Sequence, residues 1–324
     1  MLNIRTDLAI EAREMYREEK QQEIPGVKVD VSEDKGVKVT RVEVFEEVGA
    51  RIMGKPKGNY ITIEAKEIKN RDRDVYEDTS RTVAQELSRI AQVDENSTTL
   101  VVGLGNWNVT PDSLGPKVVS HLMVTRHIFE YLPDQVDEGV TPVCAISPGV
   151  LGITGIETGE IIEGLVDRIK PSRVIAIDAL ASRKLDRINT TIQISDTGIS
   201  PGSGVGNKRK ELSKQTLGVP VIAVGVPTVV DAATMASDTI DMMIDAMIKQ
   251  AHQGQEFFEV LKNMKNEDKY NLIREVLTPY VGNLVVTPKE IDDMIRDMSK
   301  ILANGLNIFL HPSIGPDDVD RYIN

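Results

Sequence analysis

Cysteine and histidine are scarce in this sequence, and their scarcity excludes several kinds of protein. The chain has one cysteine, Cys144, among 324 residues, so it forms no internal disulfide and fits a reducing compartment. Its four histidines show no zinc-binding spacing, and we expect neither a metal nor another cofactor. No apolar run reaches about 18 residues, and the charged N-terminus excludes a signal peptide. The sequence therefore predicts a cytoplasmic protein that does not enter a membrane.

Basic residues are too few for a protein that binds nucleic acid directly. The chain has 38 Lys and Arg against 50 Asp and Glu, which gives a net charge of −12. Affinity for a phosphate backbone requires concentrated positive charge. Hydrophobic residues make up 40% of the chain, which is enough to bury a sizeable core.

The pattern of apolar residues divides the chain into three parts. Residues 22–70 alternate apolar and polar positions between glycine-containing turns, which predicts an antiparallel β-rich unit. Over about 78–252 strand and helix patterns alternate, which predicts an α/β core with a mainly parallel central sheet and helices on both faces. The remainder, 253–324, is polar and helical in pattern. The helices expected after the first strand of the core include residues 115–131, 160–169, 232–252, 269–277 and 288–304.

Two aspartates follow predicted strands and are candidates for chemistry. Asp112 comes soon after the strand 99–102, beside Pro111 at the start of a predicted helix, and Asp178 ends the apolar run 173–177. Reacting groups collect beyond the carboxyl ends of parallel strands, and two close carboxyl groups can act as a general acid and a general base. The alternative is that Asp112 begins a helix and Asp178 caps a strand.

A glycine-rich loop, Pro201–Lys210, ends in three successive cations. Its backbone N–H groups fit either an anion-binding loop or a solvated surface loop, and the sequence leaves both interpretations open. Its glycine spacing differs from that of a nucleotide P-loop. The turn after residue 102 likewise lacks the third glycine of a dinucleotide fingerprint, because Asn108 stands at that position.

The triplet Asp196-Thr197-Gly198 is similar to the active-site motif of pepsin-like proteases, but the chain contains it once, whereas that arrangement needs two copies. We therefore interpret the triplet as a turn. In this turn Asp196 accepts a hydrogen bond from a backbone N–H and Gly198 has a positive φ.

Several long segments are specific enough to support a family comparison. They include VVGLGNWNVTPDSLGP, SPGVLGITGIETGEII and VIAIDALASRKLDRINTTIQISDTGISPGSGVGNKRKE. These segments resemble the germination protease family, the spore endopeptidases of spore-forming bacteria, and the resemblance covers nearly the whole chain. It implies an aspartic-type endopeptidase that degrades the small acid-soluble proteins coating spore DNA. It also implies a homotetramer in the spore core and a fold similar to that of hydrogenase-maturation proteases.

The resemblance assigns the family's two catalytic aspartates to Asp112 and Asp178. One carboxylate then activates a water molecule while the other protonates or hydrogen-bonds the scissile carbonyl, and the sequence does not say which does which. Donors to the substrate backbone are expected among glycine-rich segments, whose amides can approach a peptide closely. These candidate donors are Gly103, Gly105, Asn106, Gly202, Gly204 and Gly206.

The N-terminus carries a further expectation, because the resemblance implies a zymogen that cuts itself after an acidic residue and before a large apolar residue followed by Ala. Asp7-Leu8-Ala9 fits this pattern, which predicts residues 1–7 as a short propeptide and 8–324 as a single catalytic domain. Asp7 is also a plausible helix N-cap, and both roles can hold. Two alternatives stay open: a metal-dependent processing protease of the hydrogenase-maturation type, and a non-catalytic binding protein of the same fold.

Overall fold

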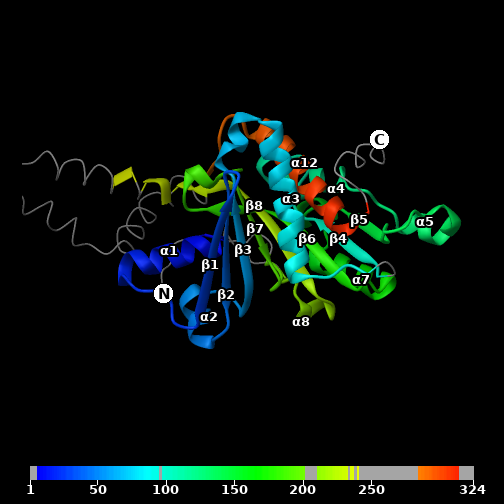
Figure 1. The fold of residues 1–324 in the computed structure, drawn as a ribbon, viewed down its shortest axis with the longest axis horizontal. Helices are drawn as coiled ribbons and strands as arrows, with labels where there is room; N and C mark the ends of the chain where they lie inside the picture. The colour runs from blue at the N-terminus through cyan, green and yellow to red at the C-terminus, as the bar shows by residue number, and fades with distance from the viewer. Residues whose placement is uncertain are drawn as a thin grey trace, which may run out of the picture.

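The structure is a computed structural model that describes residues 6–94, 97–200, 210–232, 234–236, 239–240 and 284–313. Within these ranges nine strands form one sheet in the order β1-β2-β3-β7-β8-β6-β4-β5, and β9 pairs with β8 outside that path (Figure 1). The strands are β1 (Val27–Asp34), β2 (Val37–Val44), β3 (Gly58–Glu64), β4 (Thr99–Gly103), β5 (Val143–Ile146), β6 (Arg173–Ser182), β7 (Thr191–Ser195), β8 (Val221–Asp231) and β9 (Val285–Val286).

The sheet is mixed, so the prediction of a mainly parallel sheet is wrong. Parallel pairing is confined to β5, β4, β6 and β8, whereas β1, β2, β3, β7 and β9 pair with their neighbours in antiparallel fashion. The difference arises at β7, which runs antiparallel to both β8 and β3. This strand joins the N-terminal β-rich part and the α/β core into one continuous sheet.

Nine α-helices and four 3-10 helices accompany the sheet in the described ranges. The α-helices are α1 (Ala9–Lys20), α2 (Glu47–Met53), α3 (Arg73–Ile90), α4 (Leu114–Val119), α5 (Arg126–Tyr131), α6 (Leu151–Thr154), α7 (Thr158–Ile169), α8 (Lys214–Leu217) and α12 (Ile291–Leu310). The 3-10 helices are η1 (Lys66–Asn70), η2 (Thr110–Asp112), η3 (Pro133–Gln135) and η4 (Leu185–Arg187).

The single helix expected over 115–131 is interrupted, and this correction has a visible cause. Helix α4 ends at Val119 and α5 begins at Arg126. Between them the backbone N–H of Thr125 donates to the carbonyl of Val143 at 3.0 Å, and the Thr125 hydroxyl accepts from the Val143 N–H at 2.9 Å. These bonds hold the segment against β5, where a continuous helix has no free backbone groups to make them.

The C-terminal helix is confirmed and is longer than expected. Prediction placed it over 288–304, whereas α12 runs to Leu310 and lies beside α3 (Figure 1). The helix expected over 269–277 and most of the one expected over 232–252 lie outside the described residues.

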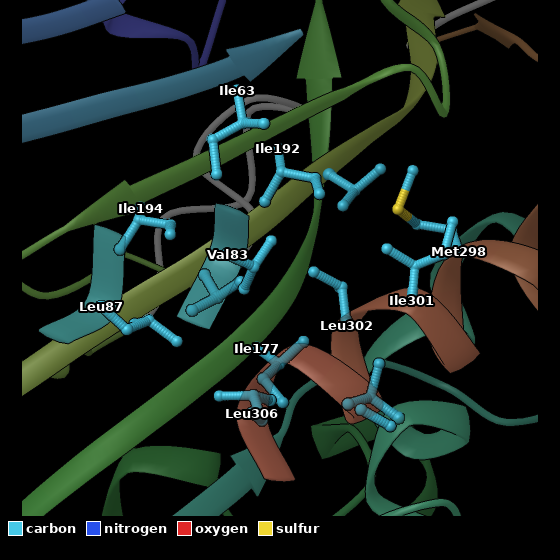
Figure 2. Close-up of a cluster of buried hydrophobic side chains, with 14 of the residues drawn as sticks. Ile63, Val83, Leu87, Ile177, Ile192, Ile194, Met298, Ile301, Leu302 and Leu306 are labelled. Carbon is cyan, nitrogen blue, oxygen red and sulfur yellow. The ribbon is translucent and has the colours of Figure 1, made fainter. Parts of the chain in front are cut away.

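Helices cover both faces of the sheet, as the alternation of strand and helix patterns predicted. On one face α3, α4 and α12 pack against strand residues that include Ile63, Ile177 and Ile192, which together form the largest apolar cluster (Figure 2). On the opposite face α7 and α8 pack on β4, β6 and β8, while α1 and α2 pack on β2 and β3. This second face carries the even-numbered residues of the first part of β6, which include Val174, Ala176 and Asp178.

Candidate active site

Asp178 lies within β6 and is buried, with 6% of its surface exposed. The strand continues four residues beyond it to Ser182, so the alternative that this aspartate caps a strand end is wrong. Parallel strand β4 stops beside Ile177, and therefore one flank of β6 is open to other partners from Asp178 onward. The carboxylate oxygen Oδ1 accepts a hydrogen bond from the Ala179 N–H at 2.9 Å.

Three paired residues form a row across the sheet at this level. Gly225 of β8 pairs with Asp178 of β6 on one side and with Gln193 of β7 on the other. Side chains of paired residues share a face, and two strand spacings amount to roughly 10 Å. Because the central residue has no side chain, the Leu180 side chain packs directly over it, and its Cδ1 lies 2.5 Å from where a Cβ of residue 225 would stand.

A cavity of about 430 Å³ lies over this row. The residues that line it come from the N-terminal segment, the turn before β3, the strands β3, β6, β7 and β8, the loop after β7, and the segment that leads to α8. They are Asp7, Gly54, Lys55, Pro56, Tyr60, Asp178, Leu180, Gln193, Ser195, Thr197, Gly198, Ile199, Ser200, Glu211, Ala223 and Gly225. The predicted processing residue Asp7 and the predicted catalytic residue Asp178 thus line one cavity.

The N-terminal segment is tied to the free flank of β6. The Asp7 N–H donates to the Ala181 carbonyl at 3.0 Å, and the Asp7 carboxylate accepts from the Ala181 N–H at 2.9 Å. Asp7 therefore does not cap α1, in contrast to the N-cap interpretation; Leu8 occupies that position and makes no side-chain cap. Leu8 is fully buried and packs with Leu180 and Ile199.

Two side chains hold the carbonyl group of Asp7. Lys55 Nζ donates to the Asp7 carbonyl oxygen at 2.8 Å, and Gln193 Nε2 donates to the same oxygen at 3.0 Å. The other end of the Gln193 carboxamide, Oε1, accepts from the Ala9 N–H at 2.6 Å. The predicted scissile bond, between Asp7 and Leu8, is therefore fixed on both sides by one glutamine.

Desolvation lowers the pKa of the Lys55 amine from its usual value, and the nearby charges of Asp7 and Glu11 partly oppose this effect. The amine also lies 6.0 Å from the centre of the Tyr60 ring. Burial raises the pKa of the Tyr60 phenol to about 12, so this group stays protonated at neutral pH.

Sequence reasoning missed both Lys55 and Gln193. A signal existed for Gln193, because it is the only amide in the buried strand Thr191–Ser195, and a polar side chain in such a strand needs a hydrogen-bonding partner. No comparable signal marked Lys55, which stands in a turn rich in glycine, proline and lysine.

Asp112 lies at the carboxyl end of β4, in the 3-10 helix η2, which is packed against β6 and β8. Three residues later, a side chain on Gly115 would meet the carbonyl of Ile177, the residue before Asp178, at 2.7 Å. The segment that carries Asp112 therefore packs beside the strand that carries Asp178. Asp112 does not, however, belong to the cavity lining that contains Asp178.

The candidate donors after β4 have other roles in the turn. Gly105 has a φ of +112°, and a side chain there would lie 2.0 Å from the Asp112 carbonyl oxygen. The Asn106 N–H donates to that same carbonyl at 2.9 Å. Gly103 lies against the backbone of Gly115, where a side chain would meet the carbonyl oxygen at 2.3 Å. The glycines thus let η2 fold closely over the end of β4, and the other candidate donors, Gly202, Gly204 and Gly206, lie outside the described residues.

The turn interpretation of Asp196-Thr197-Gly198 is confirmed. The Asp196 carboxylate accepts from the Asn59 backbone N–H at 2.8 Å and from its side-chain amide at 2.6 Å, and Gly198 has a φ of +84°. Across the described residues, no group of three or more histidine, cysteine, aspartate or glutamate side chains is arranged to hold a metal ion. None of the helices in these ranges has the length and apolar character needed to cross a membrane.

The fold and this cavity define a mixed α/β protein that holds an extended peptide segment beside a buried carboxylate. Comparison with known proteins agrees: the family model described as germination protease matches residues 7–259 and 244–323. The chain is 53% identical over 323 residues to a germination protease of Clostridium tetani, with 100% of both chains covered. It is 54% identical over 327 residues to one of Clostridium perfringens, again with 100% of both chains covered. With one of Bacillus cereus the identity is 46% over 356 residues, covering 99% of this chain and 97% of that relative.

The chain therefore belongs to the germination protease family and is an endopeptidase, a hydrolase of internal peptide bonds.

Proposed function

We propose that this endopeptidase cuts small acid-soluble spore proteins during germination, after an acidic residue and before a large apolar residue followed by Ala. The observation that carries the proposal is the position of its own Asp7-Leu8-Ala9, which has that sequence: Asp7 lines the same cavity as Asp178, and Leu8 is packed beside it against Leu180. The leucine is enclosed by apolar side chains and the aspartate is bound through its carboxylate. A substrate of the same pattern fits the same contacts once residues 7–9 of the chain have moved out of them.

The proposed catalytic groups are Asp112 and Asp178. Their support is the parallel pairing of β4 with β6, which brings the carboxyl end of β4 beside the middle of β6. A buried carboxylate in a cavity open to a peptide is suited to act as a general base toward water. The second carboxyl group supplies the proton that the leaving amine requires.

Self-processing is part of the same proposal. The bond between Asp7 and Leu8 is seated within the molecule that carries Asp178, so cleavage occurs within one chain and releases residues 1–7. Before that cleavage Asp7 forms part of the cavity wall and holds the contacts that a substrate would need. Assembly into a homotetramer, residence in the spore core and likeness to hydrogenase-maturation proteases stay predictions of the family resemblance.

The test is cleavage of a small acid-soluble spore protein by a chain that starts at Leu8, at neutral pH, with and without chelator. We expect discrete cuts before large apolar residues, indifference to chelator, and a loss of at least 100-fold in rate in Asp112→Asn and in Asp178→Asn. Asp167→Asn, on the exposed surface of α7, is the matched control and retains full activity.

The other outcomes distinguish the alternatives. Chelator-sensitive cleavage indicates a metal-dependent processing protease. Binding of the spore protein without cleavage by any form indicates a non-catalytic binding protein.

A further inference from the structure

We propose that Lys55 and Gln193 are catalytic residues that stabilise the negative charge developing on the scissile carbonyl oxygen by donating hydrogen bonds to it. Gln193 also positions Ala9, the second residue after the scissile bond. This inference rests on the proposed function, because it assigns roles at the bond between Asp7 and Leu8. Neither residue belongs to the aspartate pair or to the glycine-rich turns expected to supply donors.

The first support is convergence of two donors on one oxygen. Lys55 Nζ and Gln193 Nε2 lie 2.8 and 3.0 Å from the Asp7 carbonyl oxygen. A carbonyl oxygen has two lone pairs, so both are satisfied by side chains that come from different parts of the chain, the turn before β3 and the strand β7. Preorganised donors aimed at a developing oxyanion stabilise the tetrahedral intermediate, and both of these donors already point at the oxygen that becomes the oxyanion.

The second support is the rigidity of Gln193. Its side chain arises from a buried strand, is only 9% exposed, and stands opposite Asp178 across Gly225. Because Oε1 accepts from the Ala9 N–H, the carboxamide cannot rotate without losing a bond at one end. The orientation of its N–H donor is therefore fixed before any charge develops, which is the condition for an effective oxyanion donor.

The third support is the nature of the Lys55 contact. This amine lines the cavity rather than the outer surface, beside the acidic residues Asp7 and Glu11. A protonated amine at hydrogen-bond distance interacts more strongly with an oxyanion than with a neutral carbonyl. The contact therefore grows in strength along the reaction, and such differential binding lowers the barrier.

The chemistry balances with water as the only co-reactant. A water oxygen forms a bond to the Asp7 carbonyl carbon, one water proton passes to a catalytic carboxylate, and the carbonyl π electrons move onto the oxygen between Lys55 and Gln193. When the intermediate collapses, the carbon–nitrogen bond breaks and the Leu8 nitrogen takes a proton from a carboxyl group. The products are the main-chain carboxyl group of Asp7 and the amine of Leu8, and transfer of the remaining water proton from the first to the second gives a carboxylate and an ammonium group.

The experiment compares Lys55→Met and Gln193→Leu with the parent chain starting at Leu8, using a peptide substrate of the sequence Thr-Asp-Leu-Ala-Ile-Glu. Removal of one oxyanion donor costs about 10²- to 10³-fold in kcat. We expect that loss in each variant, with a much smaller change in KM for Lys55→Met, because its contact strengthens mainly in the transition state. Lys57→Met, two residues away on the exposed turn, is the control and keeps the parent kcat.

A second measurement isolates the positioning role of Gln193. In an ester analogue of the peptide, oxygen replaces the N–H of the alanine, so that the carboxamide has no donor to accept from. Loss of one hydrogen bond is expected to lower kcat/KM about 5- to 10-fold in the parent chain. In Gln193→Leu the ester and the amide should react at the same rate, because the interaction is already absent.

The outcomes separate this inference from the proposed function. If the parent chain cuts and Asp178→Asn does not, yet Lys55→Met and Gln193→Leu keep the parent kcat, the donor assignment is overturned and the endopeptidase proposal stands. If the parent chain does not cut, the proposed function fails. If Lys55→Met does not fold, Lys55→Gln replaces it; this variant keeps a neutral donor and is expected to lose less kcat than removal of the donor would cause. The inference is also refuted if Gln193→Leu keeps the parent kcat and if the ester lowers kcat/KM equally in Gln193→Leu and in the parent chain.

Discussion

At the scale of single residues, the missing side chain at Gly225 shapes the site. It leaves room for the Leu180 side chain, because a Cβ placed there would lie 2.5 Å from Leu180 Cδ1. Leu180 would have to move, and Leu180 is a wall of the pocket around Leu8. Gly225 is therefore required for the packing of Leu180 and not for a special backbone conformation.

We expect Gly225→Ala to lower peptidase activity by at least 10-fold while reducing the free energy of unfolding by about 1–3 kcal/mol, the usual cost of overpacking. Activity assays and urea denaturation measure the two effects. Gly164→Ala is the matched control, because a side chain at that helical position meets nothing within 4 Å. It should leave activity intact and raise stability by about 0.5–1 kcal/mol.

His311 gives a prediction about pH at the same scale. Burial lowers the pKa of this fully enclosed imidazole, although its contact with the Met123 carbonyl at 3.2 Å opposes the shift. Nδ1 accepts from the Thr141 N–H at 3.3 Å, so the neutral form fits the site. A folded pKa below the unfolded value means that the unfolded chain binds the proton first, and stability falls as pH drops below about 6.5.

This part of the pH dependence should disappear in His311→Gln, and it should persist in His127→Gln, whose imidazole is exposed. The slope for one proton is at most about 1.4 kcal/mol per pH unit. Urea denaturation at pH 7.5, 6.5 and 5.5 measures it. An unchanged slope in His311→Gln would show that another group carries the effect.

At the scale of elements, helix α1 is the part that keeps the N-terminal segment in the cavity. It is anchored by Arg187 of η4, which is 5% exposed and contacts Glu11 at 3.1 Å and Glu14 at 2.6 Å. Glu11 is 1% exposed and also accepts from the Arg183 N–H at 2.8 Å. Helix α1 is therefore held by a largely buried ion network in which one cation, Arg187, pairs with two carboxylates of the helix.

Removal of the central cation should leave the buried Glu11 carboxylate without its ion-pair partner, whereas Glu14 keeps its contact with Lys184. We expect Arg187→Leu to reduce the free energy of unfolding by about 3–5 kcal/mol, the usual cost of breaking a buried ion pair from one side. Denaturation by urea measures this loss. Arg168→Leu, exposed on α7, is the control and should change stability by less than about 0.5 kcal/mol.

At the scale of the whole molecule, the sequence predicted the antiparallel pairing of β1, β2 and β3 correctly but not the direction of β7 within the core. Runs such as Val174–Ile177 and Thr191–Ile194 are recognisable because apolar and β-branched residues dominate them. The direction of β7 depends instead on its neighbours, β3 and β8, which lie about 130 and 30 residues away along the chain. Local pattern carries no information on such pairing, so the mixed sheet was predicted as a mainly parallel one.

The candidate site shows the same division. Asp178 and the Asp7-Leu8 bond were found by strand position and by family resemblance, whereas Lys55 and Gln193 were found only when the fold brought them to one carbonyl oxygen. A lysine in a turn and a glutamine in a strand have no motif of their own. Their proposed role becomes visible only because Lys55 and Gln193, which are more than 130 residues apart in the sequence, contact the same carbonyl oxygen.

The most direct test of the account is intact mass spectrometry of the full chain over time, beside Asp178→Asn, at two protein concentrations. The account predicts loss of residues 1–7 from the parent chain, at a rate independent of concentration, and no loss from the variant. Cleavage of Asp178→Asn at the same rate, or a parent chain that is never cut between Asp7 and Leu8, would contradict it.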